Sequence, residues 1–277
     1  MIKSINCKGK LVEFDQPKVM GILNYTPDSF SDGGQFNNPT KALSHIETML
    51  NEGADFIDIG AISSRPGSDL LNAKEEKARL KPLLSEIQKI FPNQIFSLDT
   101  FRAEIAKWAV NEYNISIIND ISAGELDPKM YETISELQVP YIIMHMQGNP
   151  QNMQDNPKYN NVTQDLIQYF ARKIHELKSY AIHDVIIDPG FGFGKTLEHN
   201  YQLIKELDFF KVFDNLLLVG LSRKSMIQKT LDINAHDALN GTSVLNTIAC
   251  YKGASILRVH DVKEATQVIK LLKQINF

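Results

Sequence analysis

The sequence has little cysteine and no long apolar run. Its two cysteines, Cys7 and Cys250, lie far apart, and neither has the spacing of a metal site or of a C-x-x-C motif. We therefore expect reduced thiols and a cytoplasmic protein, because disulfides belong to oxidising compartments. No run approaches the roughly 18 apolar residues of a membrane span. The first 14 residues alternate like a hairpin and lack the apolar core of a signal peptide.

Basic residues are not in excess either. The 29 Lys and Arg stand against 33 Asp and Glu, which gives a net charge of −4. Without a basic run, the sequence predicts neither a nucleic acid nor a membrane as partner. The composition, 43% hydrophobic and 22% charged over 277 residues, is ordinary for a globular protein. Chains of this length often form one α/β barrel, and we expect residues 1–277 to form a single domain.

Short apolar runs rich in β-branched residues alternate with longer amphipathic stretches. Near-continuous apolar strands separated by helices indicate a parallel sheet that is covered on both faces. Eight such units predict an α/β fold, a (β/α)8 TIM barrel, with residues 2–14 as an N-terminal β-hairpin cap. A doubly wound open sheet is the alternative, but its glycine fingerprint is missing after the first strand. The expected strands cover 19–24, 56–60, 95–100, 116–120, 141–146, 185–190, 216–222 and 255–260, and the expected helices 39–52, 73–90, 102–112, 128–137, 162–180, 197–210, 238–252 and 261–274.

The stretch "DPGFGFGKTLEHN", which begins at Asp188, looks like a phosphate-binding loop. Its spacing excludes one, because the pattern G-x-x-x-x-G-K-[ST] requires a glycine where Pro189 stands. Proline has no backbone N–H and cannot join a cradle of such donors. The dinucleotide pattern G-x-G-x-x-G fails as well, since counting from Gly190 ends at Lys195. Asp188, at the end of an apolar strand, then becomes the residue of interest.

Polar side chains follow nearly every expected strand. The carboxyl ends of barrel strands share one face, where active sites of this fold lie. Aspartate and asparagine also end strands for structural reasons, and Asp120 suits such a turn better than its neighbour Asn119 does. His145 suits packing better than catalysis. The residues at the eight ends are Asn24, Asp58, Asp99, Asn119, His145, Asp188, Lys224, Arg258 and His260.

The chemistry of these groups limits the classes of ligand that the site suits. Carboxylates and an amide, from Asp99, Asn119 and Asp188, suit a flat heterocycle with N–H donors and carbonyl acceptors. Arginine and histidine at the other strand ends suit phosphate oxygens. Asn24 is able to donate to phosphate or to place its carbonyl oxygen on Mg²⁺. The residues therefore predict a polar heterocycle that carries a phosphate or diphosphate.

Eight motifs, in the same order along the chain, resemble those of the dihydropteroate synthase family. Together they run from about Met20 to Ala265 and so cover most of the sequence. The glycine-rich stretch discussed above is similar to the strand and turn of that family's pterin pocket. The motifs are "MGILNYTPDSFSDGG", "DIGAISSRPGS", "SLDTFRAEIA", "IINDISAG", "IMHMQGNPQNMQ", "IIDPGFGFGKTLEHN", "VGLSRKSMI" and "RVHDVKEA".

The resemblance implies a homodimeric transferase of folate synthesis that requires Mg²⁺. Its substrates are p-aminobenzoate and 6-hydroxymethyl-7,8-dihydropterin diphosphate, its products are 7,8-dihydropteroate and diphosphate, and sulfonamides compete with p-aminobenzoate. The implied catalytic residues are Asp99, Lys224, Arg258 and His260, and Asn24 is the implied metal ligand. The residues implied to bind the pterin are Asp99, Asn119, Asp188 and Lys224, and those implied to bind the diphosphate are Arg258 and His260. The residues implied to bind p-aminobenzoate are Phe30, Ser64, Arg65, Pro66 and Ser222. The implied substrate site also includes Met144, Phe193 and Gly220.

One motif departs from the family pattern. The family reads closer to "GESTRPG" where this chain has "AISSRPG". Ser64 therefore keeps a hydroxyl but lacks a methyl group, which should alter packing around p-aminobenzoate more than hydrogen bonding. Ile62 replaces a carboxylate, and nothing in the sequence explains that change.

Two other functions remain open at this point. A related pterin barrel could transfer a methyl group from a methylated folate to a corrinoid, but it would not need "SRPGS" or "RVHDV". A catalytically silent pterin-binding protein would not need Asp99, Lys224 and Arg258. Measuring diphosphate release from the pterin substrate distinguishes a synthase from the methyl transferase. A single-turnover assay distinguishes a synthase from the catalytically silent protein.

Overall fold

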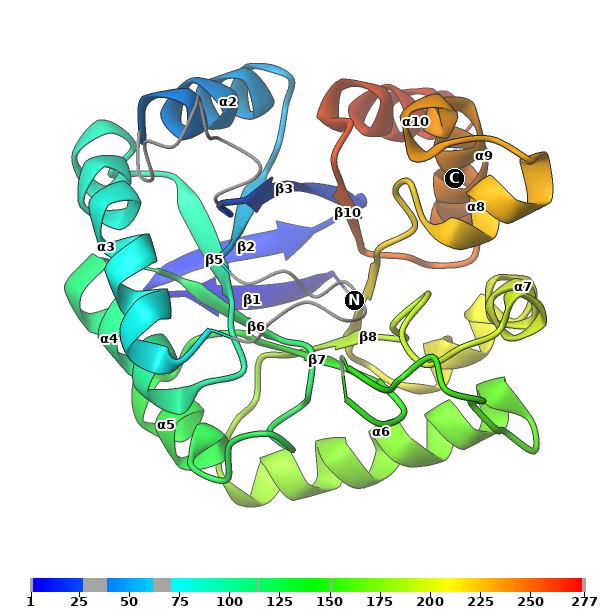
Figure 1. Cartoon of the computed structure of the whole chain (residues 1–277), viewed down its shortest axis with the longest axis horizontal. Coiled ribbons are helices and arrows are strands. Elements are labelled where there is room, and N and C mark those ends of the chain that lie inside the picture. The colour runs from blue at the N-terminus through cyan, green and yellow to red at the C-terminus, as the bar shows by residue number, and fades with distance from the viewer. Residues whose placement is uncertain (1, 27–38, 62–70, 114, 150, 276–277) are drawn as a thin grey trace.

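A computed structural model describes residues 2–26, 39–61, 71–113, 115–149 and 151–275 (Figure 1). Eight parallel strands form a closed barrel in chain order, and the last strand pairs with the first. The predicted (β/α)8 barrel is therefore confirmed. The strands are β3 (Lys18–Asn24), β4 (Phe56–Gly60), β5 (Ile95–Asp99), β6 (Ile117–Asp120), β7 (Tyr141–Met144), β8 (Val185–Asp188), β9 (Leu216–Val219) and β10 (Ile256–Val259).

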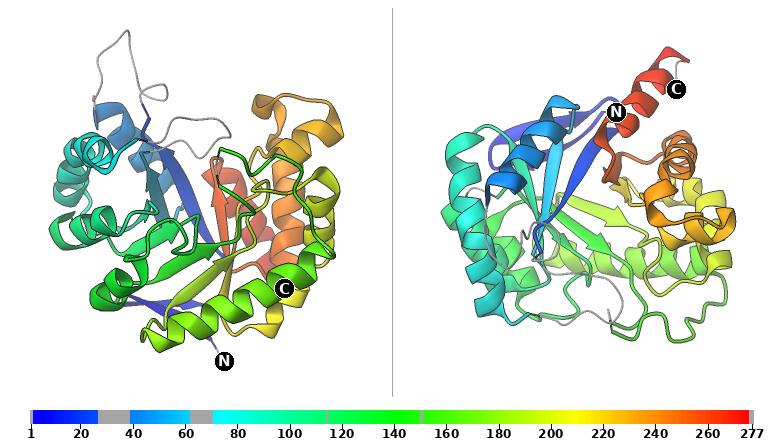
Figure 2. Two further views of the ribbon diagram at one scale, coloured as in Figure 1. Left: turned by 60° about the horizontal axis from the view of Figure 1, so that its bottom comes forward. Right: turned by 45° about the horizontal axis from the view of Figure 1, so that its top comes forward.

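Helices surround the barrel on its outer side (Figures 1 and 2). No helix in the described part of the chain is both long enough and apolar enough to cross a membrane. The helices are α2 (Pro39–Asn51), α3 (Ala73–Ile90), α4 (Ala103–Tyr113), α5 (Met130–Leu137), α6 (Val162–Ser179), α7 (Leu197–Lys205), α8 (Ser225–Leu231), α9 (Leu239–Tyr251) and α10 (Val262–Gln274), with short 3-10 helices η1 (Leu207–Val212) and η2 (Ala235–Asp237).

Two details of the helices differ from the prediction. The helix expected over 197–210 is divided into α7 and η1, because the buried Leu207 and Phe210 recur three residues apart, the spacing of a 3-10 turn. The helix α8 was not predicted. It has seven residues, of which only Met226 and Ile227 are buried, so it is too short to show a helical period.

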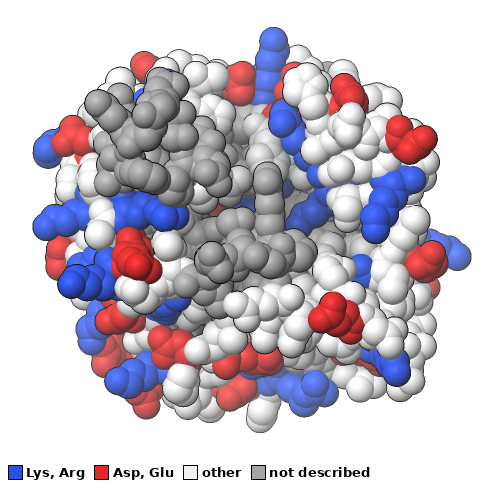
Figure 3. All heavy atoms as spheres, in the orientation of Figure 1, with Lys and Arg blue, Asp and Glu red and all other residues white. Residues whose placement is uncertain are grey.

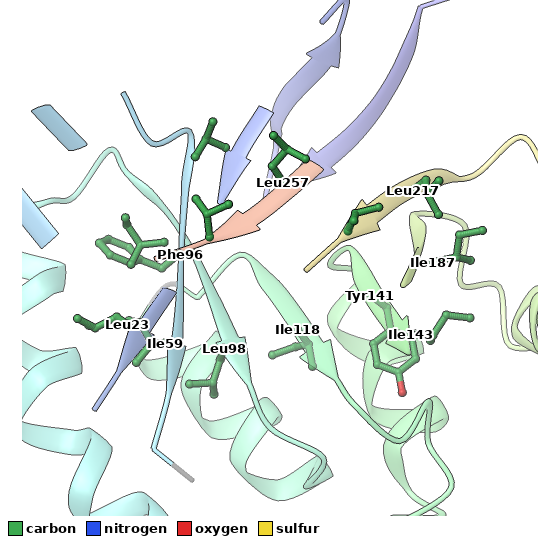
Figure 4. Packing of buried hydrophobic residues seen from close by; sticks show 14 of the residues in the cluster. Leu23, Ile59, Phe96, Leu98, Ile118, Tyr141, Ile143, Ile187, Leu217 and Leu257 are labelled. Carbon is green, nitrogen blue, oxygen red and sulfur yellow. The ribbon is translucent and has the colours of Figure 1, made fainter. Parts of the chain in front are cut away.

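The main core lies between the barrel and the helices. Figure 4 shows buried side chains contributed by successive strands, among them Leu98, Ile118 and Ile143. On α10, Ala265, Ile269 and Leu272 return every three or four residues and belong to the same core. This spacing places one apolar stripe of the helix against the sheet, so the sheet is covered on its outer face as the sequence predicts.

A hairpin closes the N-terminal end of the barrel, as predicted. Strands β1 (Lys3–Cys7) and β2 (Lys10–Phe14) are antiparallel, and Lys8 and Gly9 have positive φ at the turn between them. The rings of Phe14 and Phe56 stack with centroids 6.3 Å apart. Figure 2 shows the hairpin lying across one end of the barrel. It covers an inner apolar cluster composed of Met20, Phe56, Ile95, Ile117, Ile142, Ile186, Leu216, Leu218 and Ile256.

Candidate active site

The inner apolar cluster explains why polar groups meet at the other end of the barrel. Side chains along a strand alternate between its two faces, so residues two or four positions later face the same side. On β4, Phe56 belongs to the inner cluster while Ile57 and Ile59 belong to the outer core. Each strand thus places an inner apolar residue near its start and a site residue near or just beyond its C-terminal end: Asn24, Asp58, Asp99, Asn119, Met144, Asp188, Gly220 and Arg258.

Arg258 lies at the centre of a buried charged network. Its Nε donates to Asp58 Oδ2 at 2.7 Å, and its Nη2 donates to Asp99 Oδ2 at 3.1 Å. Asn119 Nδ2 donates to the same Asp58 oxygen at 2.8 Å. The Asp58 side chain is fully buried, and its Oδ1 has no hydrogen-bond partner within the described structure. One carboxylate therefore orients both the arginine and the amide.

Burial and charge act against each other in this network. Burial raises the pKa of Asp99 to about 7, although Arg258 favours its ionised form. Burial also disfavours the charge of Arg258, but Asp58 and Asp99 outweigh burial and raise its pKa. The guanidinium therefore stays charged, while burial opposes the ionisation of Asp99 and Arg258 supports it.

A second group faces the site from β8 and from the segments after β8 and β9. Asp188 is 8% exposed, and its Oδ1 accepts the Gly190 N–H at 2.8 Å. Lys224 Nζ lies 4.3 Å from the centroid of the Phe193 ring. Burial raises the pKa of Asp188 and lowers the pKa of Lys224 to about 8. This group offers a carboxylate, an amine and an aromatic face to one ligand.

His260 and Ser222 form a pair beside Arg258. Ser222 Oγ accepts the His260 backbone N–H at 3.2 Å and lies 3.0 Å from His260 Nδ1. The Ser222 hydroxyl has two acceptor lone pairs, so it can accept the backbone N–H and also either donate to Nδ1 or accept from an Nδ1–H. When it donates to Nδ1, the proton of the neutral ring is on Nε2. Burial, followed by Arg258, lowers the pKa of His260 to about 4. At neutral pH the ring is therefore an N–H donor and not a cation.

Apolar side chains border the same end of the barrel. The cluster contains Ile121, Met144, Met146 and Met153, with Phe193 and Phe101 packed against it. A Cβ placed on Gly220 would meet no other heavy atom within 4 Å, so this glycine borders open space. Flat apolar walls with a few polar groups are typical of a small-molecule site.

The remaining predicted site residues are placed as follows. Asn24 is exposed at the end of β3, where it pairs with Gly60. Phe30, Ser64, Arg65 and Pro66 lie outside the described residues. Within the part that the structure describes, no cluster of three or more His, Cys, Asp or Glu side chains is arranged to hold a metal.

Asp58 is the residue that the sequence reasoning passed over. The sequence places Asp58 at the end of an expected strand, where aspartate also occurs for structural reasons, and suggests no specific role for it. The alternation with Phe56 could have placed it inside the barrel. Asp120, by contrast, has the predicted structural role, because its carboxylate accepts from the backbone of Ser122 and Gly124 and from Tyr141.

His145 also has the structural role that was predicted. Its ring is buried and meets Tyr169 edge to face with centroids 4.8 Å apart. Burial lowers its pKa to about 2, so the ring is neutral. Figure 3 shows Lys and Arg interspersed with Asp and Glu around the edge of the face seen in Figure 1, which agrees with the absence of a basic run in the sequence.

Comparison with known proteins now gives the family. The pterin binding enzyme family matches residues 20–260. The chain is 43% identical to the dihydropteroate synthase of Haemophilus influenzae over 264 residues, which cover 95% of each sequence. It is 41% identical to that of Escherichia coli, over 96% of this chain and 94% of the relative. The chain belongs to the dihydropteroate synthase family.

Solved structures of this family have the same fold. A Yersinia pestis dihydropteroate synthase in complex with a sulfonamide drug matches with a TM-score of 0.92 at 38% identity, over 99% of both chains. A Xanthomonas albilineans dihydropteroate synthase with 4-aminobenzoic acid matches with a TM-score of 0.92 at 32% identity, over 100% of this chain and 99% of the other. The family that the motifs suggested is therefore confirmed.

Proposed function

We infer that this chain condenses p-aminobenzoate with 6-hydroxymethyl-7,8-dihydropterin diphosphate in folate synthesis, releasing 7,8-dihydropteroate and diphosphate. The observation that carries this function is the joint placement of Arg258, Asp58, Asp99 and Asn119 at the carboxyl end of a barrel of this family. A methyl transfer to a corrinoid gives no use to an arginine and a histidine beside that network.

We propose that the pterin ring lies between the Asp188 and Asp99 sides of the site. Asp188 keeps unused acceptor capacity for ring N–H groups, since Gly190 occupies only one direction of one oxygen. Asn119 and Lys224 add an amide and a donor, and Phe193 and Met144 supply apolar contact. Such a site distinguishes a pterin from an apolar ring because its buried polar groups need partners.

The proposed reaction breaks the bond between the pterin CH₂ and the diphosphate oxygen. Arg258, together with His260 in the tautomer that carries its proton on Nε2, stabilises the charge that develops on the leaving oxygens. Asp99, when ionised, favours the cationic character of the pterin. The neutral amine of p-aminobenzoate forms the new C–N bond and then loses one proton to water. No strong base is needed, so positioning contributes much of the rate.

We propose Mg²⁺ as the cofactor, with Asn24 as its protein ligand. The residues fit this ion, because Mg²⁺ keeps several waters and is commonly held by one or two protein oxygens together with substrate phosphates. Asn24 is exposed at the end of β3, which leaves its carbonyl oxygen accessible. When bound, the ion would supply additional positive charge to the diphosphate.

We propose that p-aminobenzoate is bound by Ser222 together with Phe30, Ser64, Arg65 and Pro66 from the first and second loops. Sulfonamides would compete at this pocket. The support is the resemblance of the two loops to the family motifs, in which Ser64 keeps a hydroxyl where threonine is common, and the position of Ser222 beside His260.

The test is a synthase assay with and without Mg²⁺, combined with a matched pair of variants at the two ends of β8. Asp188→Ala should weaken binding of the pterin severely, by about 1–3 kcal/mol or more, because ring N–H donors would lose their acceptor. Asp184→Ala is the control, since Asp184 lies just before the opposite end of the same strand and accepts the Asn6 N–H at 2.7 Å. Unchanged pterin affinity in folded Asp188→Ala, measured by calorimetry, would refute the pocket.

We propose a homodimer formed through α9. Val244, Ile248 and Tyr251 are 52%, 37% and 69% exposed, and their spacing of four and three residues aligns them on one helical face. Val244→Glu should shift the protein to monomers in light scattering. Ile90→Glu is the control, because Ile90 is equally apolar and 50% exposed but lies on α3. A monomeric wild type would refute the proposal.

We also propose a cytoplasmic location and a single domain over residues 1–277. Cys7 and Cys250 are buried and free, and burial raises the pKa of each thiol to about 12. Such inert thiols agree with a reducing compartment. The closed barrel begins at β3 and ends at β10, which supports one domain. Cell fractionation and a single cooperative unfolding transition are the respective tests.

A further inference from the structure

The lysine of the glycine-rich stretch has no role in the proposed reaction. Lys195 is 3% exposed, although a lysine is almost never fully buried without a partner. Its Nζ donates to Phe193 O at 2.9 Å and to His145 O at 3.2 Å, and it lies 3.2 Å from His145 Nδ1. All three acceptors are uncharged. The amine thus binds protein atoms from two segments.

These contacts join the end of β7 to the turn after β8. His145 follows β7 directly and donates its N–H to Asp188 O at 3.1 Å. The same His145 carbonyl that accepts from Lys195 would lie 2.2 Å from a Cβ on Gly190, which has φ of +70°. The turn therefore packs directly against the end of β7, and only glycine fits there.

The rest of the turn is held from the outside. Tyr159 OH donates to Gly194 O at 2.7 Å, and the Gly192 N–H donates to Asn200 Oδ1 at 2.7 Å. Lys195 binds the carbonyl oxygen of Phe193, whose N–H donates to Gly190 O at 3.1 Å and whose ring lies under Lys224 Nζ. Asp188, through the N–H of Gly190, is held by the same turn.

We propose that Lys195 is a positioning residue for the pterin: it links the end of β7 to the turn after β8 and so holds Asp188 and Phe193 where the ring binds. This inference rests on the proposed pterin site. It gives a purpose to a lysine that the sequence shares with phosphate loops but that here contacts carbonyl oxygens and a histidine of its own chain.

The charge of Lys195 provides a second readout. Burial lowers its pKa to about 7, with Asp188 raising it and Lys224 lowering it further. The charged and titratable groups around Asp188 are Lys224, Arg258 and Lys195, and those around Lys195 also include His145 and His199. Below pH 7 the protonated amine helps to keep Asp188 ionised. Removing that charge should raise the pKa of Asp188.

The experiment compares Lys195→Met with Lys195→Arg in steady-state kinetics across pH. Lys195→Met should raise the KM for the pterin diphosphate about tenfold, change the KM for p-aminobenzoate less than about twofold, and move the acid limb of kcat/KM to higher pH. Lys195→Arg replaces the compact amine by a planar guanidinium, so it should raise the pterin KM. Because it keeps the charge, it should leave the acid limb of kcat/KM in place. Lys8→Met is the control, because Lys8 Nζ donates to Val110 O at 2.8 Å near the opposite end of the barrel.

Each outcome decides the matter. If the folded Lys195→Met variant keeps both its pterin KM and its acid limb, the inference is wrong. Should Lys195→Met fail to fold, a wild-type pterin KM in Lys195→Arg would overturn the inference in the same way. Asp188→Ala, assayed alongside, distinguishes failure of the Lys195 role from failure of the proposed pterin site. If Asp188→Ala too leaves pterin affinity unchanged, the pterin site itself is wrong.

Discussion

Replacing Asp58 by asparagine tests whether one buried carboxylate organises the site. The change preserves shape but removes the charge from a side chain with no exposed surface. In the wild type, a single oxygen, Oδ2, accepts from Arg258 at 2.7 Å and from Asn119 at 2.8 Å. In the variant, either these two donors keep a weaker neutral acceptor or they face an amide N–H₂ group.

The structure gives the size of the effect. Hydrogen bonds that involve a charged group contribute about 1.5–3 kcal/mol, and neutral ones about 1 kcal/mol. Breaking a buried ion pair outright costs about 3–5 kcal/mol, but Arg258 retains Asp99 at 3.1 Å. We therefore expect a loss of about 2–4 kcal/mol of stabilisation. If the whole loss raises the free energy of the transition state, kcat/KM falls by about 30- to 1,000-fold.

The assay combines urea unfolding with kinetics of diphosphate release. Asp58→Asn should lower both the free energy of unfolding and kcat/KM. Asp55→Asn is the matched control, because Asp55 lies just before the same strand and binds Lys18 and the Val19 N–H at the far end of the barrel. It should lower stability and leave kcat/KM unchanged. A folded Asp58→Asn variant with kcat/KM within about twofold of the wild type would refute the organising role.

Three further predictions follow from the site. Arg258→Lys keeps the charge but loses the planar fork, so calorimetry should show weaker binding of the diphosphate substrate and nearly constant binding of the bare hydroxymethyl pterin; equal losses would remove Arg258 from the diphosphate site. The pKa of Lys224 is lowered to about 8 against about 10.4 when unfolded, so between these values unfolding takes up a proton and stability rises with pH. The Lys224→Met variant should lack that rise, of about 1–3 kcal/mol, in unfolding curves at pH 7 and 10, and a rise equal to that of the wild type would contradict the assignment. Finally, p-aminobenzoate should bind more tightly once diphosphate and Mg²⁺ are present, by about 1–3 kcal/mol, and equal affinity in titrations with and without them would indicate a preformed pocket.

The barrel could be predicted because its signal repeats. Each unit places an apolar strand before an amphipathic helix. Once a barrel is assumed, the two-residue alternation along each strand shows which side chains face its interior and which face the helices. The polar residues at strand ends follow from that arrangement, and Asp120 has the turn role that the sequence favours for it over Asn119. The family motifs then supplied roles that the spacing alone could not give.

What the sequence could not provide are the partners of each polar group. Asp58 and Arg258 are 200 residues apart in the chain, and no local pattern connects them. Lys195 is part of a stretch that resembles a phosphate loop, and the sequence does not predict its burial against His145. The helix α8 was missed for a different reason, since seven residues between a turn and a longer helix carry too few apolar positions to define a period.

The hairpin beneath the barrel implies that resistance to local opening varies along the barrel axis. At the closed end, the inner cluster of Met20, Phe56 and their neighbours is apolar, buried and enclosed by a complete ring of strands, so exposing it requires the ring itself to separate. At the other end, the strands terminate in polar groups that must admit and release ligands. Amide hydrogens on β4 and β5 should therefore exchange only through global unfolding near their starts, while exchange near Gly60 and Asp99 proceeds through smaller openings. Binding and release of substrate would then involve different openings of the same strands than global unfolding does.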